Sequence, residues 1–407
     1  MHNSILDKRY TIKALPLEGR RPSELSSIMK PHPLSYIELP FDPEYSLYNN
    51  RMTPERLNNV TDDEQYWAVR QKVIFRNTGE FPVEISGPDA EAYINHVFAR
   101  GVSTVKVGRC IYNFVLYHHG GIITDGVMLC LAKDRFWMAQ ADGELTKWYE
   151  AHSHGFDVTI SDPNVWVTQV QGPRSMDVLR DVIDGDFPDP WRYFDIATVS
   201  IAGEEVIITR TGFSNELGWE FYLRPENNAE KIGNHIWEVG KRHGMILTGT
   251  PVFRARRIEA GLLSQAEFDS TTTPFDVGLG HFVQVNKLEF IGKTALEKAD
   301  KRSRTYGMRV CGGIAELGRT ISVGAKIVGR VCSSAWSPYQ ECGVALVRMD
   351  DPDMEPNTEV EVTGTNGAMY SAQLCSLPMY DAEGAIVRGK TKTIPDGSQP
   401  WRRERQK

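Results

Sequence analysis

Two segments of the chain carry the same order of structural signals, and this order limits the folds that the chain can form. The segments VEISGPDAEAYINHVF (83–98) and WVTQVQGPRSMDVLRDV (166–182) each predict a strand, a Gly-Pro turn and a helix. Short apolar runs between them predict further strands, and Gly120-Gly121 predicts a hairpin turn between two of these runs. The sequence therefore predicts an α+β body with two related halves.

Composition separates three further regions from this body. Residues 1–45 are interrupted by six prolines and predict an irregular N-terminal extension. Short strand-like pieces follow one another between residues 301 and 385, which is typical of a small C-terminal β-barrel. Residues 386–407 form a basic tail. Residues 46–300 remain as the central body.

Charge and composition argue against several classes of protein. An apolar content of 41% is typical of a soluble globular protein, and a net charge of -7 argues against a nucleic-acid surface. No run of about 18 apolar residues predicts a membrane span, and the N-terminus does not resemble a secretory signal. We expect a cytoplasmic protein whose six scattered cysteines are free thiols.

Motifs for a metal or a dinucleotide are also missing. The histidines and cysteines lack the spacing of zinc ligands. The segment Gly278-Leu279-Gly280 lacks the third glycine, the preceding strand and the following helix that a dinucleotide site requires. We therefore expect no metal, flavin or nicotinamide.

The block TGFSNELGWEFYL (211–223) contains a strand with a functional face. Alternation along GWEFYL places the side chains of Trp219, Phe221 and Leu223 on one face of the strand. The opposite face carries Glu220 and Tyr222. If the apolar face is buried in the core, the other face can point these two side chains into a cleft. The alternative for Glu220 is a strand-end glutamate in solvent.

A second long block begins at Arg256 and ends at Leu296. A helix around Arg257 has an apolar stripe, and Arg254 and Arg257 lie beside that stripe. An acidic turn at residues 265–269 follows the helix. The block then predicts a strand bracketed by glycines and a helix that starts at Phe-Ile-Gly-Lys (290–293). Each arginine can therefore be a partly buried cation.

These two blocks, in this order, resemble the glycine-cleavage T-protein family. The first is similar to the family's TGYTGEDGFEIY motif, and Arg256–Gly261 is similar to its LRLEAG motif. A third segment, HHGGIITDGVML (118–129), resembles the family's GGILDDLIV. The resemblance covers roughly residues 46–380.

The resemblance implies a fold and a cofactor. The fold is α+β, a three-domain cloverleaf with two interleaved subdomains in the body and a C-terminal β-barrel. Tetrahydrofolate would lie in the central hole, with the carboxylate of Glu220 on its pterin and Tyr222 on the same face. Arg257 matches the folate-cleft arginine, Tyr112 matches a tyrosine of the folate pocket, and Asp125, placed at a hairpin end, matches an acid beside the transferred carbon.

Two departures from the family pattern bear on the reaction. Thr124 replaces the first residue of an acidic pair, which makes aminomethyl transfer less favoured. Glu80 and the segment LAKDRFWMAQADGELTKW (131–148) resemble the dimethylsulfoniopropionate demethylase branch, and less closely the folate-dependent aromatic O-demethylases. Phe253 stands where the aromatic branch has a tyrosine acid. We therefore expect an enzyme that transfers a methyl group from a small sulfonium or ammonium donor to tetrahydrofolate.

Aromatic side chains could bind such a cationic donor. Trp137, Trp148 and Phe253 would supply π-faces beside Glu80. Packing of these rings in the core is an open alternative for each, as it is for Tyr112. A salt bridge, for instance with Asp269, is the alternative for Arg257.

Other activities also remain open at this point. The chain could be an aromatic O-demethylase, the aminomethyltransferase of glycine cleavage, or a folate-binding regulator without catalysis. The sequence does not fix the methyl donor or the oligomeric state.

Overall fold

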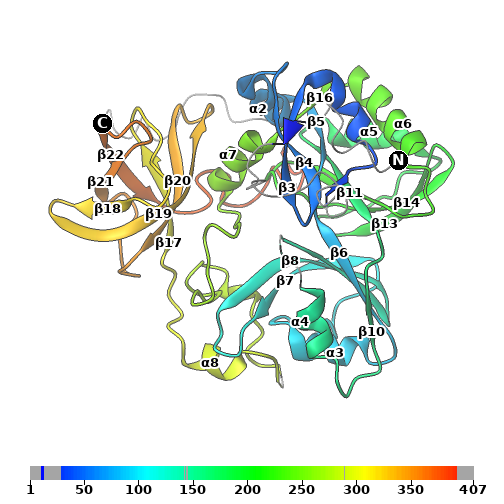
Figure 1. Cartoon of the computed structure of the whole chain (residues 1–407), viewed down its shortest axis with the longest axis horizontal. Coiled ribbons are helices and arrows are strands. Elements are labelled where there is room, and N and C mark those ends of the chain that lie inside the picture. Colours follow the sequence, from blue (N-terminus) through cyan, green and yellow to red (C-terminus); the bar gives the residue numbers. More distant parts are fainter. Residues whose placement is uncertain (1–10, 13–28, 142, 144, 288, 392–407) are drawn as a thin grey trace, which may run out of the picture.

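The computed structural model describes residues 11–12, 29–141, 143, 145–287 and 289–391. Figure 1 shows three lobes, which are two α/β lobes on the right and a barrel on the left. The α+β cloverleaf with a C-terminal barrel is therefore confirmed. Within the described residues, no helix is long and apolar enough to span a membrane.

The lower lobe in Figure 1 is a five-stranded sheet with two helices against it. The strand order is β10-β6-β9-β8-β7. The strands are β6 (Phe81–Ser86), β7 (Arg109–Leu116), β8 (Ile122–Ala132), β9 (Arg135–Gln140) and β10 (Thr159–Ser161). The helices are α3 (Ala90–Val97) and α4 (Thr146–Ala151). The turn at Gly120-Gly121 joins β7 to β8 in an antiparallel hairpin, as predicted.

The upper right lobe is a seven-stranded sheet of order β12-β13-β14-β15-β11-β5-β16. Its strands are β5 (Val73–Asn77), β11 (Trp166–Gln171), β12 (Ile183–Asp184), β13 (Ile196–Ile201), β14 (Glu204–Thr209), β15 (Gly218–Leu223) and β16 (Met245–Leu247). Helices α5 (Ser175–Val182) and α6 (Ala229–Arg242) pack on it. Since β5 precedes the five-stranded sheet along the chain and β11 follows it, the two lobes interleave.

Both predicted units of strand, Gly-Pro turn and helix are present, one in each sheet. Gly87 and Gly172 adopt φ values of +132° and +124°, which side-chain-bearing residues rarely reach. A Cβ on Gly87 would lie 2.5 Å from the carbonyl oxygen of Asp157, and one on Gly172 would lie 2.6 Å from that of Lys72. These turns therefore require glycine for conformation and for space.

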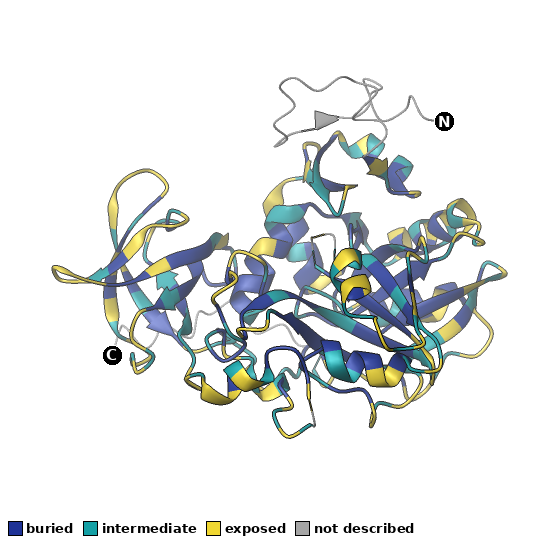
Figure 2. Ribbon diagram, turned by 60° about the horizontal axis from the view of Figure 1, so that its bottom comes forward, coloured by how far each residue is buried: buried dark blue, intermediate teal, exposed yellow. Residues whose placement is uncertain are grey.

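The third lobe is a closed barrel of order β17-β20-β19-β18-β21-β22, as the short strand-like pieces predict. Its strands are β17 (Thr305–Val310), β18 (Thr320–Val323), β19 (Lys326–Ser337), β20 (Cys342–Met349), β21 (Glu359–Thr363) and β22 (Met369–Cys375). Figure 2 shows buried residues along the barrel wall and exposed residues at the tips of its hairpins. All six cysteines are free thiols, and five of them are buried.

A small sheet from the N-terminal part of the chain has the order β1-β3-β4-β2. Its strands are β1 (Thr11–Ile12), β2 (Lys30–Pro31), β3 (Pro43–Tyr48) and β4 (Arg51–Leu57), with two 3₁₀ turns, η2 (Ser35–Ile37) and η3 (Leu39–Phe41), between β2 and β3. Helix α2 (Asp62–Gln71) follows and begins with a capping box between Thr61 and Glu64. Only residues 11–12 and 29–45 of the predicted extension, and 386–391 of the predicted tail, lie within the described residues.

One predicted element between body and barrel is wrong. Helices α7 (Thr250–Ala260) and α8 (Lys293–Lys298) form where the sequence predicts them. The strand bracketed by glycines does not form, because its residues make a 3₁₀ turn, η4 (Gly280–Phe282), with Phe275 packed against Gly280. Val283 and Phe275 are instead buried in a cluster with Phe114 of β7.

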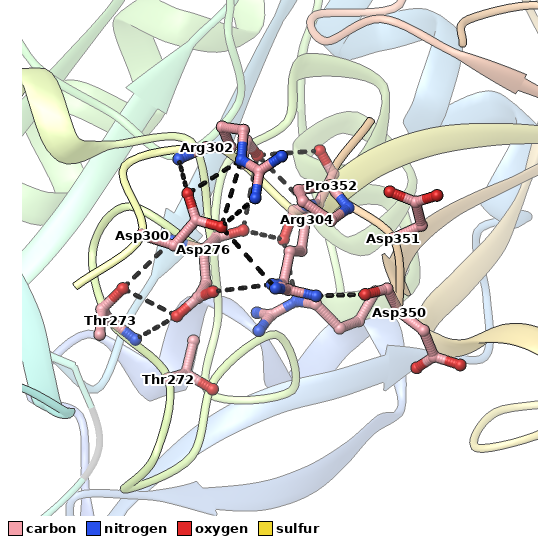
Figure 3. A network of polar contacts seen from close by, with 12 residues as sticks. Thr272, Thr273, Asp276, Asp300, Arg302, Arg304, Asp350, Asp351 and Pro352 are labelled. Atoms are coloured by element: carbon pink, nitrogen blue, oxygen red, sulfur yellow. Dashed lines mark hydrogen bonds and ion pairs between the residues drawn. The ribbon is translucent and has the colours of Figure 1, made fainter. Parts of the chain in front are cut away.

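Two ionic networks of opposite character join the body to the barrel. Figure 3 shows the exposed one, in which Arg302 pairs with Asp300, and Arg304 pairs with Asp276. Arg302 also pairs with Asp353 of the barrel. The other network is fully buried beneath α7. Its members are Arg70, Arg256, Glu216 and Glu259, with Tyr66, Ser337 and Tyr380 as hydrogen-bond donors to Glu259.

Candidate functional site

A row of polar side chains crosses the seven-stranded sheet. Arg76 on β5, Gln169 on β11, Glu220 on β15 and Thr209 on β14 are successive register partners. Cross-strand partners place their side chains on the same face of a sheet. Tyr222 lies on that face, in an apolar cluster that the two sheets share. The row therefore borders the space between the two sheets.

Glu220 is the acidic residue of this row, and two side chains donate hydrogen bonds to it. Gln169 Nε2 donates to its Oε1 at 2.9 Å, and Thr211 Oγ1 donates to its Oε2 at 2.5 Å. The residue is only 8% exposed. Burial, followed by the nearby carboxylate of Glu80, raises the pKa of Glu220 to about 7. The alternation predicted for β15 is confirmed, and the alternative of a strand-end glutamate in solvent is wrong.

Two further acceptor atoms beside Glu220 are buried and have no hydrogen-bond partner among the described residues. They are Oε1 of Gln169 and Oε2 of Glu80. A buried acceptor without a donor costs free energy, so a ligand with N–H groups would relieve this cost. A pterin carries an exocyclic amine and ring N–H groups, and the acceptor-rich row fits that donor edge.

A second acidic site forms on the five-stranded sheet. Tyr112 on β7 donates its hydroxyl proton to Asp125 Oδ2 on β8 at 2.5 Å. The predicted place of Asp125 at a hairpin end is wrong, because β8 begins at Ile122 and the residue lies within the strand, only 8% exposed. Burial raises the pKa of Asp125 to about 6. Tyr112 also contacts Phe114 and Phe282, so its ring is packed while its hydroxyl faces a polar partner.

Arg257 lies near Asp125, where its charge opposes the rise in that carboxyl's pKa. Arg257 NH1 pairs with Glu267 Oε2 at 2.9 Å, and not with Asp269. Glu267 is fully buried and also accepts hydrogen bonds from Ser264 and from Ser333 of the barrel. Asp269 is half exposed and lies 3.7 Å from Arg330. The alternative of a salt bridge for Arg257 is therefore confirmed, but its partner is Glu267 and not Asp269.

A groove of about 950 Å³ lies between one side of α7 and the barrel. Arg257 and Arg254 line its α7 side, and Leu317 and Trp336 line its barrel side. Both apolar residues are exposed, at 65% and 41%. Arg257 thus faces this groove while its charge acts on Asp125.

Comparison with known proteins gives the family. The GCVT N-terminal domain matches residues 36–287, and the glycine cleavage T-protein C-terminal barrel domain matches residues 304–381. The chain belongs to the glycine cleavage T-protein family. This membership confirms the predicted family and the prediction of a one-carbon transferase. The family is folate-dependent.

Several curated T-protein relatives match along most of the chain. Trimethylamine-oxide aldolase of Ruegeria pomeroyi is 31% identical over 80% of the chain and 44% of its own length, so the chain spans less than half of that relative. Aminomethyltransferase of Streptomyces coelicolor is 28% identical over 79% of the chain and 90% of its own length. Dimethylsulfoniopropionate demethylase DmdA of Ruegeria pomeroyi is 29% identical over 79% of the chain and 90% of its own length.

A solved T-protein shares the fold. The aminomethyltransferase T of the glycine cleavage system from Bartonella henselae superposes with a TM-score of 0.78 at 20% identity. The match covers 87% of this chain and 98% of that one.

The three aromatic residues that were predicted to bind the methyl donor do not lie together. Trp137 is buried 5.9 Å from the ring of Tyr222, and its indole N–H donates to Glu84 at 2.7 Å. Phe253 lies under the guanidinium of Arg76, at 4.8 Å, and so borders the polar row. Trp148 on α4 contacts His152 at 4.3 Å, outside the group around Glu220. The structure therefore brings two of the three rings near the row.

Sequence reasoning missed Gln169, Thr211 and Glu267. Alternation in WVTQVQ places Gln169 on the face of Val167 and Gln171, but only the register of β11 with β15 sets it beside Glu220. Thr211 begins the TGFSNE motif, which the sequence marks without assigning it a role. Glu267 is one of two acids in the same turn, and the sequence does not show which of them is buried.

Proposed function

We propose that this T-protein family member transfers a methyl group from a small methylated donor to N5 of tetrahydrofolate. The observation that carries the proposal is a group of buried acceptors, formed by Glu220 and Gln169 of the row and by Glu80 beside it, in which Gln169 Oε1 and Glu80 Oε2 have no partner among the described residues. Bound tetrahydrofolate supplies N5, a nucleophile that can take up a one-carbon group. The row would bind the donor edge of the pterin and so fix its orientation.

The second acidic site would handle the proton of the reaction. Tyr112 and Asp125 share one short hydrogen bond, so a proton can be held between the phenol and the carboxylate. With a pKa of about 6, Asp125 is mostly ionised at neutral pH and can accept a proton. Arg257 lowers the pKa of Asp125 by its charge, but the paired carboxylate of Glu267 acts in the opposite direction and more strongly, so this ion pair would help to keep the pKa of Asp125 raised.

A donor with a positively charged methylated atom is favoured over an aryl ether. A sulfonium or ammonium group leaves as a neutral thioether or amine and needs no acid, whereas an aryl ether leaves as a phenolate. Phe253 carries no acidic proton at the position where an acid would assist the phenolate. The names of two relatives refer to dimethylsulfoniopropionate and trimethylamine oxide, which both carry methyl groups on a charged heteroatom. Trp137, Phe253 and Glu80 would bind such a cation.

One assay tests the proposal and separates its alternatives. The protein is incubated with tetrahydrofolate and a panel of S-, N- and O-methyl donors, and 5-methyltetrahydrofolate is measured by mass spectrometry. We expect product from a small sulfonium or methylammonium acid. Product from a vanillate-type ether alone would overturn the donor. Turnover only with an aminomethylated lipoyl carrier protein would identify an aminomethyltransferase, and tight binding without any turnover would identify a folate-binding regulator.

A further inference from the structure

The carboxylate of Glu220 lies at the end of a chain of hydroxyl groups. Thr209 and Thr211 form a short hydrogen bond between their Oγ1 atoms, and Thr211 Oγ1 lies 2.5 Å from Glu220 Oε2. Thr209 Oγ1 lies 3.5 Å from the same oxygen. Both threonines are buried, with exposures of 0% and 3%. Both hydroxyl groups therefore lie inside the protein.

The backbone of Thr211 is also held in place. Gln171 Nε2 donates to the carbonyl oxygen of Thr211 at 3.1 Å, and Ser214 Oγ donates to Gln171 Oε1 at 2.7 Å. Gln171 lies two residues from Gln169 on the same face of β11. One strand thus holds both Glu220, through Gln169, and Thr211, through Gln171.

The direction of the hydrogen bonds shows how the two threonine hydroxyl groups act on Glu220. A hydroxyl has one proton, so Thr211 donates to Glu220 only if it accepts the proton of Thr209. In that arrangement Gln169 and Thr211 each point a donor at the carboxylate, and the remaining lone pairs of Glu220 stay available for a ligand. We propose that Thr211, with Thr209 behind it, is a positioning residue that orients Glu220 and keeps both its oxygens as acceptors for an N–H-bearing ligand. This inference rests on the proposed folate site.

The surroundings of Glu220 oppose its ionisation, and the hydrogen bonds from the threonine hydroxyl groups act against this effect. Burial is the largest effect that raises its pKa, and Glu80 adds a like charge. Among the described residues, Tyr222, Cys110 and Tyr193 are further titratable groups near Glu220, and the Tyr222 hydroxyl lowers the pKa of Glu220 by a hydrogen bond. Because a donor to the charged form lowers the pKa of an acid, loss of the Thr211 hydroxyl should raise it further.

The test compares Thr211→Val with Thr211→Ser, which restores the hydroxyl, and with Thr168→Val as a matched control. Thr168 is fully buried on β11 and donates to the Arg76 carbonyl and to Asn77, away from Glu220. Two quantities are measured between pH 6 and pH 9. One is the titration of the Glu220 carboxyl carbon by ¹³C NMR, assigned with Glu220→Gln. The other is the affinity for tetrahydrofolate by calorimetry.

We expect the Glu220 titration midpoint to rise by about one pH unit in Thr211→Val and to stay near the wild-type value in the other two variants. With a wild-type pKa of about 7, the affinity of Thr211→Val for tetrahydrofolate should fall about fivefold at pH 7 and less than twofold at pH 9. An unchanged midpoint in folded Thr211→Val would overturn the role of Thr211. A shifted midpoint in Thr211→Val, combined with a wild-type protein that binds no tetrahydrofolate, would keep this role and refute the folate site.

Discussion

Glu220 and Asp125 are both buried carboxyl groups, but their partners suit them to different tasks. Glu220 receives hydrogen bonds from Gln169 and Thr211, so it is built as an acceptor. Asp125 accepts one short hydrogen bond from Tyr112, and burial raises its pKa to about 6, so it is suited to take part in proton transfer near neutral pH. Each task predicts a separate phenotype when the carboxylate becomes an amide.

We predict that Glu220→Gln weakens tetrahydrofolate binding. The change keeps the shape of the side chain but removes the charge from its hydrogen bonds to the pterin, which should cost about 1.5–3 kcal/mol. Calorimetry at pH 8, where the wild-type carboxyl is ionised, measures this loss. Glu84→Gln is the control, because Glu84 accepts hydrogen bonds from Arg135 and Trp137 and lies outside the row. Equal affinity of Glu220→Gln and wild type would remove Glu220 from the site.

We predict that Asp125→Asn slows methyl transfer by about 10²–10⁴-fold, the usual contribution of a general acid or base. The pKa of Asp125 is raised above its unfolded value, so the stability that the protonated form contributes is lost as pH rises through about 6. The amide does not ionise, and the variant should therefore be at least as stable as wild type at pH 8. The wild-type rate should rise between pH 5 and 7, while the rate of the variant stays low. A variant with the wild-type rate would contradict this role.

Motif position identified Glu220, Tyr222, Tyr112 and Asp125 as residues that the fold buries near polar partners. It did not identify those partners. Arg257 illustrates the reason, because Glu267 and Asp269 lie in the same turn, and Glu267 is held by Ser264 next to it and by Ser333 of the distant barrel. A contact between side chains far apart in sequence depends on register and domain packing, which local patterns do not encode.

Among helices, strands and turns, local sequence patterns predicted the structure best where the backbone can adopt only one conformation. Gly87 and Gly172 are fixed by their positive φ values and by space, since a Cβ on either would lie 2.5 or 2.6 Å from a backbone oxygen. The strand that was predicted after Gly278 does not form, and there the local pattern allows more than one conformation. Its apolar residues suit a strand equally well, but Phe275 packs against Gly280 and turns the chain.

We predict that Gly172→Ala destabilises the protein by more than the matched change Gly155→Ala. Both glycines have positive φ values, of +124° and +91°, so both variants carry backbone strain. Only Gly172 also meets backbone atoms, whereas a Cβ at Gly155 has no atom within 4 Å. Urea unfolding followed by circular dichroism should show the larger loss in Gly172→Ala. Equal losses would mean that the close approach to Lys72 is relieved at little cost.

At the scale of the whole molecule, a buried ionic network attaches the barrel to the body. The buried network places Arg70 and Arg256 on the same oxygen of Glu216, at 2.6 and 2.7 Å, and Arg256 also pairs with Glu259. Glu259 in turn accepts a hydrogen bond from Ser337 of the barrel. The TGFSNE and RRIEAG motifs thus supply structural residues, Glu216, Arg256 and Glu259, as well as candidate ligands.

We predict that Arg256→Met lowers the free energy of unfolding by about 3–5 kcal/mol, because it leaves buried carboxylates without one of their cations. Arg302→Met is the matched change in the exposed network, where the side chain is 55% exposed and solvent screens its ion pairs. It should alter stability far less. Raising the salt concentration should reduce the effect of Arg302→Met but leave that of Arg256→Met nearly unchanged, since buried pairs are poorly screened. Urea unfolding of both variants at two salt concentrations measures this. A larger loss in Arg302→Met would show that the linker, and not the buried network, holds the barrel to the body.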